Sequence, residues 1–133
     1  MTSAIDENRV GTVIVESAIE VHRVLGNGLL ESVYEKALAC ELIDRGMLVE
    51  TQVPVQVQYK GRPLELGFRA DLVVDSLVLV ELKSVETVTL AHRKQVQTYL
   101  NLIGYRLGYL LNFGAALMKQ GIIRCVNGLP DVK

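Results

Sequence analysis

The hydrophobic positions of the chain change period twice, and each change predicts a change of secondary structure. Over residues 7–25 the apolar side chains recur at helical spacing, which predicts a first helix that ends near residues 26–28. A second helix is predicted over residues 29–45, closed by Gly46. The positions expected to face the core are Val10, Val13, Ile14, Val21 and Val24, with Ala18 beside them, in the first helix, and Leu30, Val33, Ala37 and Cys40 or Glu41 in the second.

The next segments change to a period of two. Residues 49–53 and 55–59 alternate apolar with polar side chains, which is typical of strands exposed to water on one face. Pro54 separates them or marks a sheet edge, because proline cannot donate to a ladder. A turn at residues 60–63 leads to a further short strand at residues 64–68. We therefore expect an antiparallel meander after the two helices.

Helical spacing returns after Thr87 or Thr89, either of which can cap a third helix that ends at Gly104. Its predicted core stripe is Val96, Leu100 and Ile103. A second line, at spacings of three and four, carries His92, Gln95 and Tyr99. This line faces either a functional site or solvent.

Two apolar runs complete the predicted fold. Residues 105–113 are expected to form a strand joined through the helix crossover and parallel to the strand before that helix. Residues 120–126 are expected to add an edge strand. The chain of 133 residues then makes a single α/β domain, residues 1–133, with helices around a mixed central sheet.

The hairpin predicted at residues 69–83 carries the candidate chemistry. A three-residue loop would pair Val74 with Val78 and bring Asp71 opposite Glu81, with their β-carbons within roughly 5.5 Å. A two-residue loop would instead place Asp71 and Glu81 on opposite faces of the hairpin. The register of this hairpin therefore decides whether the two carboxylates meet.

Two carboxylates this close repel each other unless a positive charge lies between them. A divalent cation is one solution, since Mg²⁺ typically takes one or two protein carboxylates and fills its shell with waters and phosphate oxygens. Lys83 lies two positions beyond Glu81 on the same face, where it could orient an attacking water or neutralise a phosphate. The alternative is that Asp71, Glu81 and Lys83 form a structural ion pair at the hairpin end.

Three motifs carry a resemblance to known nucleases. Asp71 followed by residues 81–83, Glu-Leu-Lys, resembles the D…(D/E)-x-K core of the PD-(D/E)xK nuclease superfamily, with Ala70 where the motif has proline. Residues 28–34, Gly-Leu-Leu-Glu-Ser-Val-Tyr, are similar to the signature of the GxxExxY proteins grouped with that superfamily. Residues 95–99 resemble the Q-x-x-x-Y motif of its exonuclease-type members. The resemblance implies a restriction-endonuclease-like αβββαβ core and metal-dependent phosphodiester hydrolysis.

The resemblance also implies roles for single residues. Mg²⁺ or Mn²⁺ would be held by Asp71 and Glu81 with help from Glu31, for which the alternative is a first-turn acid favoured by the helix dipole. The expected catalytic residues are Asp71, Glu81, Lys83 and Gln95. The expected substrate-binding residues are Tyr34, Arg69, His92 and Tyr99. The expected partner is nucleic acid, DNA more than RNA.

Composition narrows these hypotheses. The net charge of −1 excludes a protein that holds long DNA through a general basic excess, so contacts must come from a local patch or the basic residues are simply solvated. The residues available for such a patch are Lys60, Arg62, Arg69, Lys83, His92, Arg93 and Lys94. Nothing in the sequence indicates a membrane span or export, so we expect a cytoplasmic protein with free thiols. The alternative function is an inactive nuclease fold used as a binding or regulatory module, monomeric or dimeric.

Overall fold

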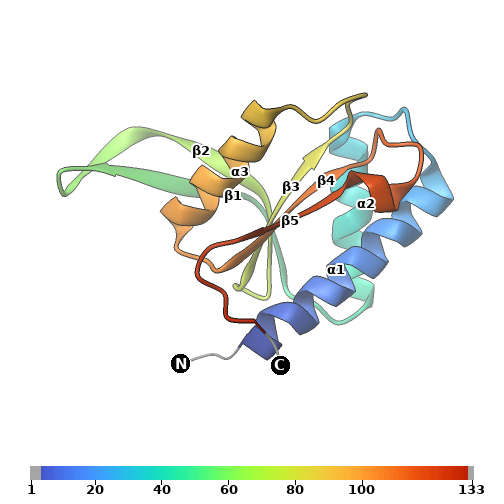
Figure 1. The fold of residues 1–133 in the computed structure, drawn as a ribbon, viewed down its shortest axis with the longest axis horizontal. Coiled ribbons are helices and arrows are strands. Elements are labelled where there is room, and N and C mark those ends of the chain that lie inside the picture. The colour runs from blue at the N-terminus through green and yellow to red at the C-terminus, as the bar shows by residue number, and fades with distance from the viewer. Residues whose placement is uncertain (1–3, 132–133) are drawn as a thin grey trace.

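The computed structural model describes residues 4–131, with the side chains of residues 4, 5, 65 and 66 left aside, and shows a sheet flanked by helices (Figure 1). The elements in chain order are α1 (Ala4–Leu25), α2 (Glu31–Asp44), β1 (Val49–Tyr59), β2 (Arg62–Val74), β3 (Val78–Lys83), α3 (Leu90–Ile103), β4 (Leu107–Asn112), the 3₁₀ helix η1 (Met118–Gly121) and β5 (Ile122–Val126). This order contains the predicted αβββαβ core and confirms the α/β, restriction-endonuclease-like fold.

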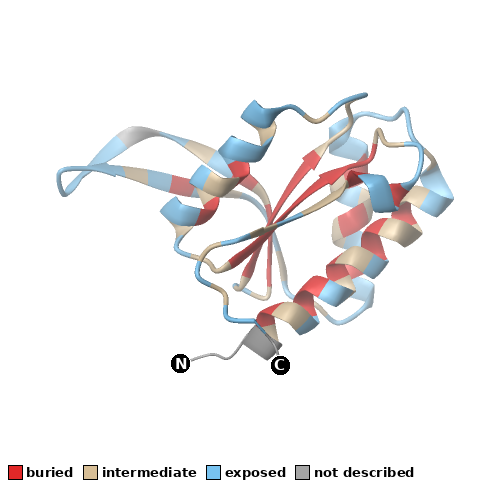
Figure 2. Ribbon diagram, in the orientation of Figure 1, coloured by how far each residue is buried: buried red, intermediate tan, exposed pale blue. Residues whose placement is uncertain are grey.

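The described strands form one five-stranded sheet in the order β1-β2-β3-β4-β5. β3 and β4 are parallel, as predicted, and the other neighbours are antiparallel. α1 and α2 cover one face, while α3 makes the crossover from β3 to β4 over the other face (Figure 1). With both faces covered, β3 and β4 are the most deeply buried strands (Figure 2).

The core stripe of α1 agrees with the predicted pattern except at its end. Val10, Ile14, Ala18 and Val21 are buried, and Val13 packs partly against them. The side chain of Val24 is 63% exposed, so its predicted place in the core is wrong. The reason is that the last turn of α1 lies at the solvent-exposed end of the helix.

The predicted core stripe of α2 is wrong by one position. The buried residues are Tyr34, Leu38 and Leu42, whereas Leu30 is 74% exposed. The physical reason is the ring of Tyr34, which is fully buried and stacks on Phe113 at a centroid distance of 4.6 Å, turning its side of the helix toward the sheet. The other positions expected in that stripe are exposed or partly packed: Val33, Ala37, Cys40 and Glu41.

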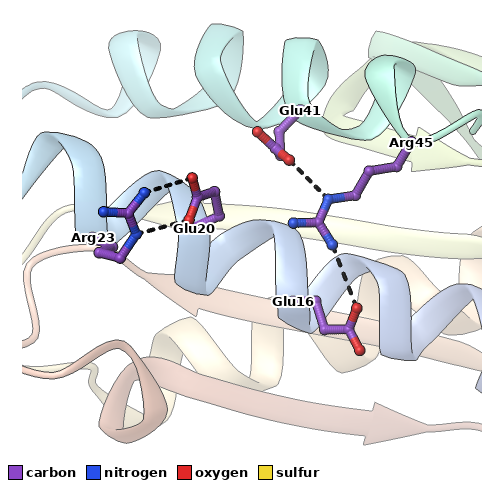
Figure 3. Close-up of polar contacts among 5 residues, drawn as sticks. All are labelled: Glu16, Glu20, Arg23, Glu41 and Arg45. Atoms are coloured by element: carbon purple, nitrogen blue, oxygen red, sulfur yellow. Dashed lines mark hydrogen bonds and ion pairs between the residues drawn. The ribbon is translucent and has the colours of Figure 1, made fainter.

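Ion pairs on the surface link α1 and α2 (Figure 3). Arg45, just beyond α2, contacts Glu41 at 2.8 Å and Glu16 of α1 at 3.4 Å. Within α1, Arg23 contacts Glu20 through two hydrogen bonds of 2.8 Å. Exposed pairs of this kind contribute little to stability, so the apolar interface holds the two helices together and the ion pairs only line its rim.

β1 and β2 are each one continuous strand, which corrects the prediction of several short ones. Pro54 lies opposite Arg69 of β2. Because β1 is an edge strand, the side of Pro54 that lacks an N–H can face away from β2 without loss of a ladder hydrogen bond. The pairing shifts register between Gln56 and Gln58. Beyond this point the two strands project from the rest of the molecule (Figure 1). We call residues 56–67 the β1–β2 arm.

The β2–β3 hairpin has the register that brings the predicted carboxylates together. Val74 pairs with Val78, and the N–H of Leu77 donates to the carbonyl of Val74 at 3.0 Å. Asp75 and Ser76 both have a φ of 53°, as a type I′ turn requires. The β2–β3 ladder ends at the pair of Leu72 and Val80, after which β2 parts from β3 and continues beside β1.

The second half of the chain follows the predicted elements. Thr89 caps α3, and Gly104 ends the helix in the left-handed conformation with a φ of 80°. Val96 and Leu100 are buried beneath α3, and β5 is the predicted edge strand. None of the helices in the described part of the chain is both long enough and apolar enough to cross a membrane.

Candidate active site

Two carboxyl groups meet where β2 leaves β3. The N–H of Asp71 donates to Glu81 Oε1 at 3.3 Å, and the N–H of Leu82 donates to Asp71 Oδ2 at 2.9 Å. These side-chain hydrogen bonds take over from the backbone ladder, which ends one pair earlier. The parting of the strands therefore creates the space in which Asp71 and Glu81 lie side by side.

Glu81 is held in an environment that opposes its negative charge. Its side chain is deeply buried, with only 6% of the residue exposed. Burial, together with the charge of Asp71, raises the pKa of Glu81 to about 9, and Lys83 offsets only part of this effect. Glu81 consequently carries a proton at neutral pH unless another positive charge comes between the two carboxyl groups.

Lys83 follows Glu81 at the end of β3 and is half-buried. Leu79, two residues before Glu81, belongs to the apolar cluster under α3, so the alternation of the strand directs Glu81 and Lys83 to the α3 side. Lys83 lies close enough for its charge to lower the pKa of Glu81. The structure thus brings Asp71, Glu81 and Lys83 together in the arrangement that the hairpin register predicts.

Two further residues join this cluster, and the sequence motifs did not reveal them. The side-chain amide of Gln52 donates to Glu35 Oε1 at 2.7 Å and to Asp71 Oδ1 at 3.3 Å, so it bridges the two acids. Burial and the charge of Asp71 raise the pKa of Glu35, against the hydrogen bond from Gln52. The signal for Glu35 was its position one helical turn after Glu31. Gln52 has a φ of 50°, a backbone conformation that the sequence does not indicate.

Glu31 begins α2 and faces the same space. A cavity of about 530 Å³ is lined by Glu31, Glu35, Gln52 and Asp71, among others. Glu31 Oε1 accepts a hydrogen bond of 3.4 Å from the N–H of Ser84, on the loop after β3. Glu31 therefore lies at the exposed mouth of the cavity, while Glu35 lies deeper, beside Asp71.

The donor groups of this cavity fit a hydrated hard cation. Within the described residues, no three His, Cys, Asp or Glu side chains converge closely enough to enclose an ion. Mg²⁺ does not require such a cage, because one or two protein carboxylates with waters and phosphate oxygens complete its shell. The possible ligand groups nearest to Asp71 are the carboxyl groups of Glu81 and Glu35, whose oxygens suit Mg²⁺ or Mn²⁺ better than metals that prefer thiolates.

The α3 side of the site is formed by the predicted line of polar residues. Gln95 Nε2 donates to the hydroxyl of Tyr99 at 2.7 Å, and the ring of Tyr99 stacks on Phe68 at a centroid distance of 3.4 Å. Burial, together with the charges of Glu81 and Asp71, raises the pKa of Tyr99. Gln95 is exposed and Tyr99 is half-buried, so the hydrogen bond between them connects the surroundings of the acids to the surface of α3.

Arg69 lies at the foot of the arm, and His92 lies at the start of α3. Arg69 Nη1 donates to the carbonyl of Gln52 at 3.2 Å, which places it beside the bridge between the acids. His92 Nδ1 accepts from the N–H of Thr89 and its own N–H bonds the Thr89 hydroxyl, forming a capping box. The hydrogen bonds of His92 thus cap the N-terminal end of α3.

Tyr34 is not brought to the cavity, which corrects its predicted place among the substrate-binding residues. Its hydroxyl donates to the carbonyl of Gly26 and accepts from the N–H of Leu29 at 3.2 Å. Because the ring is fully buried and the hydroxyl already has two partners, Tyr34 holds the loop between α1 and α2. That loop includes Gly28, whose φ of 101° requires glycine.

Comparison with known proteins assigns the chain to a family. A solved structure described as "Crystal structure of SSO0001" resembles it with a TM-score of 0.50 and 23% sequence identity over 76% of this chain and 52% of that one. This likeness shows a shared fold, and the chain spans about half the length of that protein. No curated protein matches the chain. A family model described as the PD-(D/E)XK nuclease superfamily matches residues 8–125, and the chain therefore belongs to that superfamily.

Proposed function

We propose that this chain is a metal-dependent nuclease that hydrolyses phosphodiester bonds of nucleic acid. The observation that carries the proposal is the contact between Asp71 and Glu81 beside Lys83, at the point where β2 and β3 separate. A buried carboxyl pair of this kind is unfavourable as a purely structural feature, because burial and mutual repulsion both oppose the charged form. In a member of a nuclease superfamily, such a pair would be suited to holding a catalytic cation.

Each residue of the site has a role in this proposal. Asp71 and Glu81 would hold Mg²⁺ or Mn²⁺, with Glu31 or Glu35 contributing through water from α2. The bound cation would supply a water of lowered pKa and a Lewis acid for the phosphate. Lys83, on the α3 side, would orient the attacking water or stabilise the charge that develops on the phosphate oxygens. Gln52 would keep Asp71 and Glu35 in place through its two amide hydrogen bonds.

The substrate would approach from the side of α3 and the foot of the arm. Tyr99, bonded to Gln95, lies there close to the acids, and Arg69 at the foot of the arm provides a cation beside Gln52. Arginine is well suited to a phosphate oxygen because its guanidinium presents several donors in one plane. Nucleic acid, with DNA favoured over RNA, is the proposed substrate class.

A nuclease-fold binding or regulatory module is the second candidate function. The observation that favours it is that both oxygens of Asp71 already accept hydrogen bonds, from Leu82 N–H and from the Gln52 amide. A carboxylate satisfied in this way can serve as a structural link between β1, β2 and β3. Binding of nucleic acid without cleavage would then be the activity of the chain.

We also propose that the chain is a GxxExxY protein within the superfamily. The structure gives a physical reason for each signature position. Gly28 adopts a left-handed backbone, Glu31 opens α2 at the mouth of the cavity, and Tyr34 bonds both sides of the loop. The signature therefore describes a rigid loop that presents the first acid of α2 to the site.

The test is a cleavage assay on labelled DNA and RNA, single- and double-stranded, with Mg²⁺ or Mn²⁺ and with chelator. Parent protein is compared with Asp71→Asn, Glu81→Gln and Lys83→Ala, and with Glu86→Gln as a matched control at an exposed position near the site in sequence. We expect cleavage by the parent to require the cation. The cleavage rate should fall at least about a hundredfold in the three site variants and stay unchanged in the control. Binding without cleavage by the parent would move the assignment to the binding module. Cleavage that survives in Glu81→Gln would contradict the proposed site.

A further inference from the structure

The β1–β2 arm is a long antiparallel ribbon with little support from the rest of the molecule. At its foot, Val55 is buried and Phe68 stacks on Tyr99 of α3. Beyond them the ribbon runs out to the pair of Tyr59 and Arg62, and its outer part is mostly exposed (Figures 1 and 2). A two-stranded ribbon alone is only marginally stable in water, so an arm of this length is better explained by a partner than by its contribution to the core.

A register shift and a glycine shape the arm. The register shift begins after the pair of Gln56 and Gly67. At Gly67 a β-carbon would come within 2.7 Å of the Val55 carbonyl oxygen, so the two strands approach closely there. Such irregularities bend a ribbon and increase its twist. Around this bend lies a hollow of about 300 Å³, whose lining includes Pro54 and Arg69. The arm is therefore a curved projection that begins at the candidate active site.

The charge of the arm differs in sign from that of the chain. By sequence, residues 56–67 contain two cations, Lys60 and Arg62, and one acid, Glu65, whereas the whole chain has a net charge of −1. Lys60 and Arg62 are both exposed at the tip. Tyr59 is 58% exposed, and Lys60 Nζ lies 5.4 Å from the centroid of its ring. Amine, guanidinium and phenol groups are those that contact phosphate and sugar in nucleic-acid complexes.

The geometry points to the β1–β2 arm as the element that holds a nucleic-acid duplex against the active site. This inference rests on the proposed function for the class of partner and specifies a duplex rather than a single strand. A two-stranded ribbon fits the major groove of a duplex. The stretch from Arg62 to Asp71 spans at most about 30 Å at roughly 3.3 Å per residue. That reach is close to one turn of B-DNA, about 34 Å, so Lys60 and Arg62 contact phosphates about one turn from the scissile bond.

The experiment compares Lys60→Ala/Arg62→Ala with Arg9→Ala/Lys119→Ala in the chain of 133 residues. Both double variants remove one lysine and one arginine from exposed positions, but Arg9 is on α1 and Lys119 is on η1, away from the arm. Binding is measured by fluorescence anisotropy in chelator, so that the readout does not depend on cleavage. The probes are stem-loops with stems of about 20 and about 6 base pairs and an unpaired strand of equal length, each over a range of salt concentrations.

The arm variant is expected to bind the long stem about tenfold or more weakly and to lower the slope of log affinity against log salt by about two. The short stem is expected to lose much less because it does not reach the tip, and the single strand because it has no groove in which the ribbon can lie. Equal losses in the two double variants, or equal losses on long and short stems, would overturn the inference. Absence of duplex binding by the parent protein would also overturn the inference. The proposed nuclease function would still be decided separately, by the cleavage assay. A parent that sediments as a dimer, with unchanged duplex affinity in the arm variant, would assign the arm to a second copy of the chain.

Discussion

Glu81→Gln is expected to make the metal-free protein more stable at neutral pH, although it removes a residue of the proposed active site. The parent must keep Glu81 protonated or bury its charge beside Asp71, because the pKa of Glu81 in the folded protein is raised to about 9. In the unfolded chain the same carboxyl ionises freely near its ordinary pKa of 4.5. Glutamine has nearly the same shape and no charge to bury.

The size and sign of the effect follow from proton linkage. A group whose pKa is raised on folding contributes its full stabilisation below its unfolded pKa, and this contribution is lost as the pH rises toward the folded pKa. Between about pH 4.5 and about pH 9 the folded protein binds more protons, so the free energy of unfolding falls by roughly 1.4 kcal/mol per pH unit from this group. At about pH 7 the loss amounts to about 3 kcal/mol, which Glu81→Gln should recover.

The assay is urea denaturation of the metal-free protein at several pH values, with Glu86→Gln as the matched control. The midpoint of the parent should fall as the pH rises from about 5 to about 8, and the dependence should be much weaker in Glu81→Gln. Mn²⁺ in large excess should stabilise the parent and leave Glu81→Gln nearly unchanged. If Glu81→Gln is less stable than the parent at neutral pH, and the parent shows no decline with pH, the proposed electrostatics of the buried carboxyl pair are wrong.

Three further variants test contacts outside the acid pair. Tyr34→Phe removes the hydroxyl that bonds the α1–α2 loop and should lower the free energy of unfolding by about 1 kcal/mol in urea titrations, with an unchanged value contradicting the loop role. Arg106→Gln removes an ion pair of two hydrogen bonds with the buried Glu7. Because Arg106 lowers the pKa of Glu7, the variant should lose free energy of unfolding mainly above the ordinary pKa of that carboxyl and less as the pH falls. A loss of free energy of unfolding that grows in acid would refute this. Gly114→Ala places a β-carbon against the Val85 backbone and should cost about 1–3 kcal/mol, and a thermal midpoint equal to that of the parent would show that the two loops can separate.

The parts of the fold that the sequence predicted are those set by local pattern and turn chemistry. The change of period at Gly46 located the strands, and the polar residues Asp75 and Ser76 located the hairpin turn. The length of the loop stayed open in the sequence, and the structure shows the three-residue loop that brings Asp71 next to Glu81. Gly104 gave the end of α3 in the same way, and of the two predicted caps, Thr87 and Thr89, the structure uses Thr89. These features depend on residues close together in sequence, which is why the hairpin could be predicted, while the register that joins its two acids needed the structure.

The features that sequence reasoning missed depend on contacts between distant segments. The phase of α2 is set by the stacking of Tyr34 on Phe113, which lies in the turn after β4, far away in the sequence. The bridge made by Gln52 requires a left-handed backbone in β1 and the arrival of Glu35 from α2, neither of which has a local signal. The arm was missed because Pro54 suggested an end to the strand, whereas the unpaired edge of β1 accommodates it.

The most direct test of the central claim is calorimetric titration of Mn²⁺ into the parent, Asp71→Ala, Glu81→Ala and Glu86→Gln, in buffers of different ionisation enthalpy. A cation held by Asp71 and Glu81 should bind the parent and the Glu86→Gln control and should fail to bind the other two variants. Because Glu81 is protonated at neutral pH, binding should release about one proton per ion. Two results would contradict a metal-dependent active site where β2 and β3 separate. One is absence of Mn²⁺ binding to the folded parent, with nucleic acid present as well; the other is equal Mn²⁺ binding in all four proteins.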